Sequence, residues 1–147
     1  QTCALPIYPA DGHVARLTRV TLDELASMPQ QKLSLPVSTD PKIRAMADAL
    51  VSRPEDRSTL KEWAKRLALS ERSFARLMQR ETGLSFGRWR QQLHLIIALR
   101  ELASGVPVQN VATTLGYESV NAFITMFRKE MGSTPAHYFA ERKNSGR

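Results

Sequence analysis

Apolar residues recur at helical spacing after residue 40, and one such pattern occurs twice. The stretch SERSFARLMQRETG, residues 70–83, places Phe74, Leu77 and Met78 on one face of a helix. The stretch SVNAFITMFRKEMG, residues 119–132, has a serine, an apolar face, a glutamate and a final glycine at matching positions. The agreement reaches back to earlier residues, where Leu60, Trp63, Ala64 and Leu67 recur as Val108, Val111, Ala112 and Leu115. The sequence therefore predicts a duplicated helical unit.

Each copy predicts two short helices joined by a tight turn. In the first copy, Thr59 and Glu62 have capping-box spacing, and only two residues separate that helix from Ser70, the N-cap of the next. Helices joined so closely must cross steeply, which is the helix-turn-helix arrangement. Gly116 supplies a permissive turn residue in the second copy, whereas Ala68 occupies this place in the first. If the turn requires a positive φ, Ala68 is strained.

Further helical patterns complete a chain that we expect to be all-α. Asp40 followed by Pro41 is a helix start with an N-cap and a proline at the first helical position. Residues 85–104 predict a long connector helix closed by Gly105, and about nineteen residues at ~1.5 Å each span ~28 Å. A final short helix is expected after Thr134, with Tyr138 and Phe139 closing the core.

The first part of the chain carries weaker patterns. The opening QTCALPI resembles a translated sequencing-adapter tail, so we assign no function to residues 1–7. The chain begins with Gln rather than Met, which indicates a fragment or a processed product. Thr21 and Glu24 have capping-box spacing for a short helix, and residues 32–38 are expected to be an extended linker. The expected organisation is an artefactual start plus linker (1–39), a first unit (40–84), a connector (85–105), a second unit (106–142) and a tail (143–147).

Basic residues are concentrated in the duplicated part. The chain has 21 Lys and Arg against 14 Asp and Glu, a formal net charge of +7. The first 55 residues hold six of each sign, so the whole excess lies beyond them. This points to DNA, RNA or an anionic membrane as a partner, the alternative being a solvated basic surface. No apolar run reaches the ~18–20 residues that a membrane-spanning helix needs.

The sequence offers no catalytic constellation. His13, His94 and His137 lack metal-ligand spacing, and no glycine-rich phosphate loop occurs. Cys3 is the only cysteine and has no base nearby, so no disulfide forms within the chain and a reducing, cytoplasmic setting is expected. We predict no enzyme activity, no cofactor and no metal site.

The outer face of the helix over residues 71–82 is cationic. Arg72, Ser73 and Arg76 point away from its apolar face. A guanidinium can bind O6 and N7 of guanine together, so Arg76 is the first candidate for base recognition. For each arginine the alternative is a phosphate contact or a solvated surface position.

The matching face of the helix over residues 120–131 is mostly neutral. Asn121 has the groups to pair with adenine, and Val120 and Ile124 offer contacts to thymine methyl groups. The remaining candidates on this face are Ala122, Thr125 and Arg128. We expect the first helix to contribute more to affinity and the second to recognise a more apolar patch.

Helix ends supply a second set of candidates. Ser70, Ser85 and Ser119 are predicted N-caps, and helix N-termini also bind phosphate. The full set of predicted phosphate contacts is Ser70, Arg80, Ser85, Ser119 and Lys129. Glu81 and Glu130 lie late in their helices, against the helix dipole, which predicts a specific partner such as a connector arginine.

The order and spacing of three stretches resemble the C-terminal DNA-binding domain of the AraC/XylS family of transcription regulators. The stretches are SERSFARLMQRETGLSF, WRQQLHLIIALRELASG and VQNVATTLGYESVNAFITMFRKEMGSTPAHY. The resemblance covers roughly residues 40–142 and implies seven helices, with helices 71–82 and 120–131 in successive major grooves. It places base contacts at Arg72, Ala75, Arg76, Val120, Asn121, Ala122, Ile124 and Thr125. His94 stands where many relatives have arginine, so a supporting salt bridge is absent.

The resemblance also implies partners. It implies double-stranded DNA and a small-molecule effector bound only through a missing N-terminal cupin-like domain, to which the segment before Pro41 would be the linker. RNA polymerase is expected as a second partner. The fragment is then a monomer, whereas the full-length protein would dimerise. The alternative function is a helical protein-interaction module contacting the transcription machinery, for which Val120 and Ile124 would be the apolar contacts. An enzyme fragment is a third.

The charge distribution generates a direct prediction. Binding to DNA should weaken steeply as salt concentration rises, because each phosphate contact releases condensed counterions. Titration of a labelled duplex at several salt concentrations measures the slope. Salt-independent binding, or no binding to any genomic fragment, would contradict the DNA interpretation.

Overall fold

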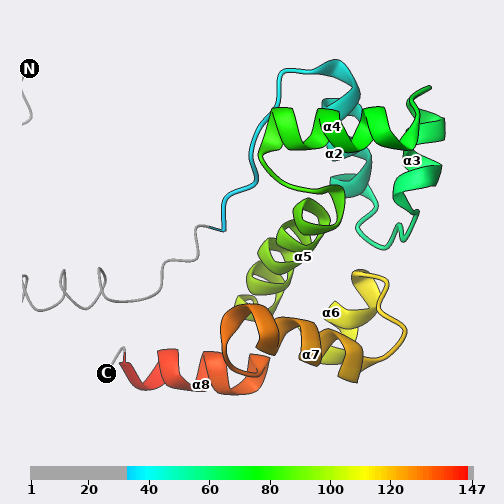
Figure 1. Ribbon diagram of the computed structural model, residues 1–147. Helices are drawn as coiled ribbons and strands as arrows, with labels where there is room; N and C mark the ends of the chain where they lie inside the picture. The colour runs from blue at the N-terminus through cyan, green and yellow to red at the C-terminus, as the bar shows by residue number, and fades with distance from the viewer. Residues whose placement is uncertain (1–32, 146–147) are drawn as a thin grey trace, which may run out of the picture. The chain divides into compact units, whose positions relative to one another are not determined.

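The computed structural model describes residues 33–145, in which seven α-helices and no strand occur (Figure 1). The helices are α2 (Pro41–Ser52), α3 (Leu60–Arg66), α4 (Glu71–Thr82), α5 (Phe86–Ala103), α6 (Val108–Thr114), α7 (Val120–Met131) and α8 (Pro135–Ser145). All seven belong to one compact unit, Ser34–Arg147. The all-α prediction is confirmed, with α3–α4 and α6–α7 as the two helix-turn-helix pairs and α5 as the connector. The predicted helix after Thr21 lies outside the described residues, as do residues 1–7.

The first unit is built from α2, α3 and α4. The Asp40 carboxylate caps α2 by accepting hydrogen bonds from the backbone N–H groups of Lys42 and Ile43. Met46 and Leu50 of α2 are fully buried, as are Phe74 and Met78 of α4. The predicted capping box of α3 is present, since Thr59 and Glu62 each bond to the other's backbone.

The turn between α3 and α4 has the strain that the sequence suggested. Ala68 has φ +55°, in the left-handed region, and the corresponding Gly116 of the second pair has φ +72°. In both turns the next residue donates its N–H back to an alanine carbonyl, Leu69 to Ala64 at 2.9 Å and Tyr117 to Ala112 at 3.0 Å. The two turns therefore share one backbone geometry although only one of them has a glycine.

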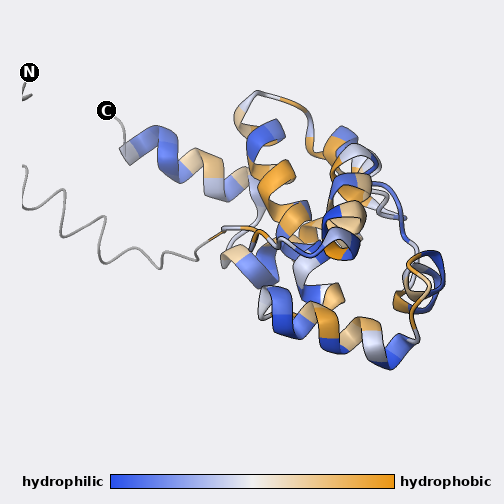
Figure 2. Ribbon diagram, turned by 90° about the horizontal axis from the view of Figure 1, so that it is seen from above, coloured by the Kyte–Doolittle hydropathy of each residue, from blue (hydrophilic) through white to orange (hydrophobic). Residues whose placement is uncertain are grey.

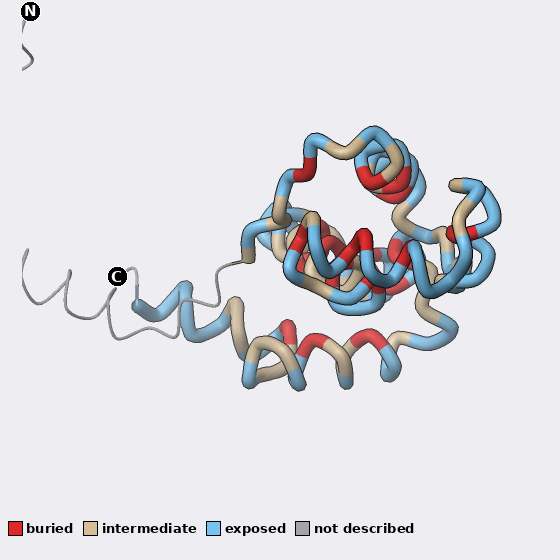
Figure 3. The backbone as a smooth tube through the Cα atoms, turned by 45° about the horizontal axis from the view of Figure 1, so that its top comes forward, coloured by how far each residue is buried: buried red, intermediate tan, exposed pale blue. Residues whose placement is uncertain are grey.

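The connector α5 is buried on more than one side. Ser85 caps its N-terminus, and Trp89, Leu93, Leu95, Ile97 and Ala98 are all buried. At the first turn, the rings of Phe86 and Phe74 lie 5.6 Å apart, which ties α5 to α4. A helix that is apolar around much of its circumference is normally covered by neighbours, and here both pairs supply them. Buried and exposed residues alternate along α4 and α7, whereas most of α8 is exposed (Figure 3).

The second unit is organised around aromatic rings. Phe123 and Phe127 of α7 are fully buried. The Phe127 ring meets Tyr138 of α8 edge-on at 5.8 Å, so Tyr138 packs against the core as expected, although Tyr138 and Phe139 remain half-buried.

Helix α8 is longer than the sequence predicted. It continues to Ser145, into residues 143–147, which were expected to be a tail. Two side-chain bonds across one helical turn accompany the extension, from Arg142 to the Tyr138 hydroxyl at 2.7 Å and from Ser145 to the Glu141 carbonyl at 3.1 Å. Its last turns are hydrophilic (Figure 2), so short-range bonds rather than a buried face continue the helix.

We predict opposite effects for two reciprocal substitutions in the turns. Ala68→Gly should raise the free energy of unfolding by about 0.5–1 kcal/mol, because glycine adopts this φ without strain. Gly116→Ala should lower it by about 2 kcal/mol or more, because the added Cβ would lie 2.6 Å from the Glu55 carbonyl oxygen. Urea unfolding measures both.

Gly83→Ala is the matched control. Gly83 also has φ +72°, but an added Cβ would meet nothing within 4 Å. Gly83→Ala should therefore lower the free energy of unfolding only by the backbone strain, about 1 kcal/mol. Equal losses in the Gly83 and Gly116 variants would show that the contact with Glu55 has no energetic weight.

Candidate nucleic-acid interface

The outer face of α4 presents exposed cationic groups. The hydroxyl of Ser70 accepts the Ser73 N–H at 3.1 Å and donates to the Ser73 hydroxyl at 2.8 Å, which fixes the first turn. Arg72, Ala75 and Arg76 are exposed, opposite the buried Phe74 and Met78. Within residues 33–145, neither Arg72 nor Arg76 has a carboxylate at ion-pair distance. This leaves both guanidinium groups available to an external acceptor.

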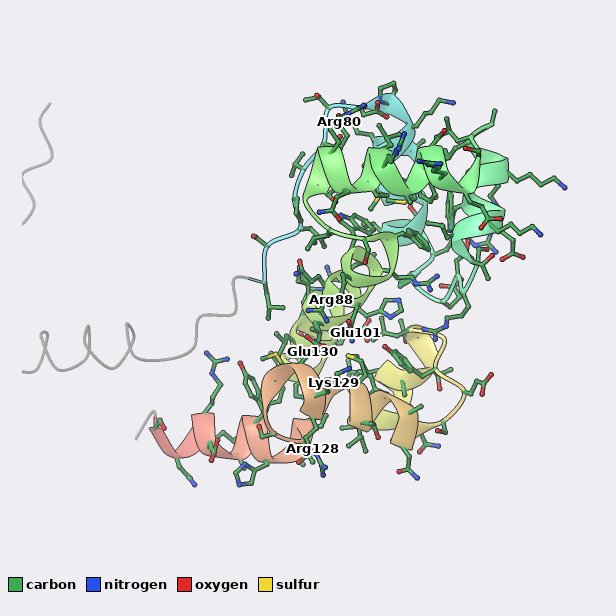
Figure 4. The ribbon with its side chains drawn as sticks, in the orientation of Figure 1. Arg80, Arg88, Glu101, Arg128, Lys129 and Glu130 are labelled. Carbon is green, nitrogen blue, oxygen red and sulfur yellow. The ribbon has the colours of Figure 1, made fainter. Side chains whose placement is uncertain are left out.

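The outer face of α7 is less charged and less exposed. Asn121, Ala122 and Thr125 are exposed, whereas Val120 and Ile124 are half-buried. Arg128 and Lys129 are exposed near the C-terminal end of the helix, where Figure 4 labels them. The structure thus brings the predicted positions of each helix onto one face, as the sequence pattern required.

The predicted phosphate contacts have different surroundings. All three serines are caps, with Ser70 accepting from Ser73 N–H, Ser85 from Arg88 N–H at 3.3 Å and Ser119 from Ala122 N–H at 3.1 Å. Arg80 lies 3.3 Å from the Glu81 carboxylate, so a phosphate would compete with that carboxylate for the guanidinium. The cap role is confirmed, and the phosphate role stays a prediction.

The two late glutamates have partners, but of different kinds. Glu130 pairs with Arg88 of the connector at 3.0 Å, as predicted, and its side chain is only 13% exposed (Figure 4). Glu81 instead accepts a hydrogen bond from the hydroxyl of Ser38 at 3.0 Å and pairs with its neighbour Arg80. The expectation of a connector arginine is therefore right for Glu130 and wrong for Glu81.

His94 lies where the two helix pairs meet through α5. It is 1% exposed, with Nε2 3.0 Å from the Pro54 carbonyl oxygen and Nδ1 3.4 Å from the Tyr117 hydroxyl. The pKa of His94 is lowered from 6.5 to about 4, mainly by burial; the hydrogen bond to Pro54 opposes this shift, and the nearby Arg57 and Arg90 add to it. Burial also raises the pKa of Tyr117. His94 is therefore neutral at neutral pH and bonded to both units.

Sequence reasoning did not identify His94, Arg57 or Ser38 as structurally connecting residues. A histidine within the apolar pattern of the connector was the available signal for His94. Its partners could not be found from local spacing, because Pro54 and Tyr117 are 40 and 23 residues away in the chain.

Within residues 33–145, no group of three or more His, Cys, Asp or Glu side chains is placed to hold a metal ion. Among the helices of this described part, none combines the length and apolar character that a bilayer crossing requires.

Residues 63–141 match the family model described as a helix-turn-helix domain. The chain belongs to the AraC-type helix-turn-helix family. The match runs from Trp63 within α3 to Glu141 within α8, so it includes the end of α3, all of α4 to α7, and most of α8.

The AraC-type assignment agrees with curated relatives and solved structures. The chain is 53% identical over 131 residues to the HTH-type transcriptional regulator NimR of Escherichia coli K12, covering 89% of this chain and 48% of NimR. It is 32% identical over 103 residues to RipA of Corynebacterium glutamicum, covering 70% and 31%. The chain thus spans about half the length of NimR and about a third of the length of RipA.

Two solved structures share the AraC-type fold. The DNA-binding domain of AdpA, crystallised with a target DNA, superposes with a TM-score of 0.65 at 28% identity, covering 73% of this chain and 96% of that one. The C-terminal domain of AraT from Geobacillus stearothermophilus gives 0.62 at 26%, covering 67% and 84%.

The buried histidine predicts a pH dependence of stability for this AraC-type unit. The folded pKa of His94 lies below its unfolded value of 6.5, so the unfolded chain binds the proton more tightly. The stability that neutral His94 provides should be complete above about pH 6.5 and lost as pH falls toward 4, by roughly 3 kcal/mol at most.

Urea unfolding between pH 7 and 4 compares the parent with His94→Gln, which cannot titrate in this range. The pH slope should be smaller in the variant. Arg100→Gln, at an exposed residue of the same helix, is the control and should keep the parental slope. An unchanged slope in His94→Gln would contradict the prediction.

Proposed function

We propose that this chain binds double-stranded DNA sequence-specifically and serves in transcription regulation, with α4 and α7 as the recognition helices. The observation that carries the proposal is the pair of twelve-residue helices, each capped, with a buried inner face and an exposed outer face. Such a helix can present side chains to a major groove while its own position stays fixed. The unit that binds would be residues 40–142.

The connector supports simultaneous binding in two grooves. Its 18 residues rise by about 27 Å at ~1.5 Å per residue. Successive major grooves on one face of DNA lie ~34 Å apart, so α4 and α7 at the two ends of α5 would lie in neighbouring grooves.

The two recognition surfaces would make different kinds of contact with the DNA. On α4, the exposed Arg72 and Arg76 have no competing carboxylate among the described residues, so they would supply charge and guanine recognition. On α7, Asn121 and Thr125 would read base edges, and Val120 and Ile124 would reach thymine methyl groups. The small side chains of Ser73, Ala75 and Ala122 would allow the helices to approach the DNA closely and would add no charge.

The second candidate is a protein-interaction module. Its supporting feature would be an exposed apolar stripe on α7, but Val120 and Ile124 are half-buried and flanked by exposed Asn121 and Thr125. Our proposal for the full-length protein also includes a contact with RNA polymerase, an effector-binding domain elsewhere in the chain, and dimerisation. It further includes a cytoplasmic location and the lack of enzyme activity.

Selection of bound duplexes from a random DNA pool tests this function. A shared motif with two blocks about one helical turn apart is the expected result. Recovery of no motif, together with salt-independent retention of DNA, would contradict it.

Arg76→Ala should weaken binding to the selected motif by about 1–3 kcal/mol and relax base preference at one position, because one bidentate contact is lost. Electrophoretic mobility shift on the motif and its single-base variants measures both effects. Equal weakening on all sequences would instead make Arg76 a phosphate contact.

Arg44→Ala is the charge-matched control. Arg44 is an exposed arginine on α2, outside both recognition helices. Its loss should change the salt-dependent affinity slightly and leave the base preference at every position unchanged.

A further inference from the structure

Three segments that are distant in the sequence meet around His94. They are the loop between α2 and α3, the middle of α5, and the turn between α6 and α7. The Nε2 atom of His94 lies 3.0 Å from a carbonyl oxygen of that loop, and Nδ1 lies 3.4 Å from the hydroxyl of Tyr117 in that turn. We call this cluster the joint, comprising Pro54, Glu55, Arg57, His94, Gly116 and Tyr117.

One tautomer of neutral His94 satisfies both bonds. The Pro54 carbonyl can only accept, so Nε2 must donate its N–H. In neutral imidazole Nδ1 then accepts, and the Tyr117 hydroxyl donates to it. The neutral ring therefore bonds the first unit's loop on one side and the second unit's turn on the other.

Backbone contact between the units tightens the joint. A Cβ at Gly116 would lie 2.6 Å from the carbonyl oxygen of Glu55 and 3.0 Å from its Cα, so the two backbones touch. The Arg57 guanidinium lies over the Tyr117 ring, 5.0 Å from its centroid. Arg90 of α5 donates to the Ser58 carbonyl at 2.7 Å, which holds the loop against the connector.

The joint supplies a connection that the chain alone does not. The path from α5 to α6 runs through Gly105, with φ +88° and no neighbour within 4 Å of its missing Cβ. Backbone hydrogen bonds from Gly105 N–H to Leu102 and from Val106 N–H to Glu101 close this turn, but they fix the chain only at the end of α5, so they alone would not prevent a pivot of the second pair. The joint near the middle of α5, together with the Arg88–Glu130 ion pair, opposes such a pivot at two further points.

We propose that the joint fixes the orientation of α7 relative to α4 and so determines which separation of two recognition sequences the protein accepts. Its residues are positioning residues that touch no DNA, and the proposal rests on the DNA-binding function proposed above. One inserted base pair rotates the second block by about 35° and moves it by ~3.4 Å. A rigid pair of helices cannot follow that displacement, whereas a loosened pair can.

The first experiment measures spacing discrimination. The probes are the selected motif and the same duplex with one or two base pairs inserted between its blocks. The ratio of dissociation constants, inserted over native, is compared among the parent, His94→Leu and Gly116→Ala. We expect this ratio to fall by about tenfold in both variants. The coupling free energy between contacting groups commonly corresponds to a change of about that size in a dissociation constant.

A general loss of stability cannot imitate this result, because a smaller folded fraction weakens binding to both duplexes equally. Tyr117→Phe removes only the hydroxyl and keeps the ring, so it provides a milder variant if the others do not fold. Arg100→Gln, exposed on α5 and outside the joint, is the control and should keep the parental ratio.

The second experiment needs no DNA. Spin labels at Arg80→Cys on α4 and Lys129→Cys on α7, with Cys3→Ser, report the distance distribution between the two helices. The distribution should be narrow in the parent and broader in His94→Leu.

The outcomes separate the two proposals. A narrow parental distribution that broadens in the variant, without any DNA motif, would support the joint and overturn the proposed function. A parental spacing ratio in both His94→Leu and Gly116→Ala, together with a parental distance distribution in His94→Leu, would overturn the joint. If those two variants do not fold, the same two results in Tyr117→Phe would overturn it.

Discussion

The left-handed residue at the end of α3 and of α6 is the constraint on which each helix pair depends. A positive φ at Ala68 and Gly116 stops the first helix and turns the chain, and the following N–H bonds back to Ala64 or Ala112. Ala64 and Ala112 are both buried, and each presents only a methyl group to its surroundings. The crossing in turn decides which side of α4 and α7 is buried, and hence which side chains face outward.

The features that depend on short sequence separations were predictable. The capping box at Thr59 and Glu62, the serine caps and the strain at Ala68 each involve residues within one helical turn. The outer faces of α4 and α7 follow from the same periodicity, because the buried phenylalanines fix the opposite side.

The features that depend on tertiary contact were mostly not predictable, the exception being the pairing of Glu130 with a connector arginine. Glu81 bonds to Ser38, which is 43 residues earlier, and no periodicity relates the two. The contacts of His94 and Gly116 likewise require knowing how the second helix pair lies against the loop after α2. Helix α8 passed its predicted end because bonds across one turn can continue a helix without an apolar face.

Ser38 has a mechanical consequence. Its hydroxyl accepts from the N–H of Asp40, the α2 cap, and donates to Glu81 in the last turn of α4. The chain that enters this unit is therefore attached to the end of a recognition helix before its first helix begins. A force applied to the residues before Ser38 would act first on the Ser38–Glu81 hydrogen bond, and through it on α4, the helix that carries Arg72 and Arg76. It would reach the core between α2 and α4 only afterwards.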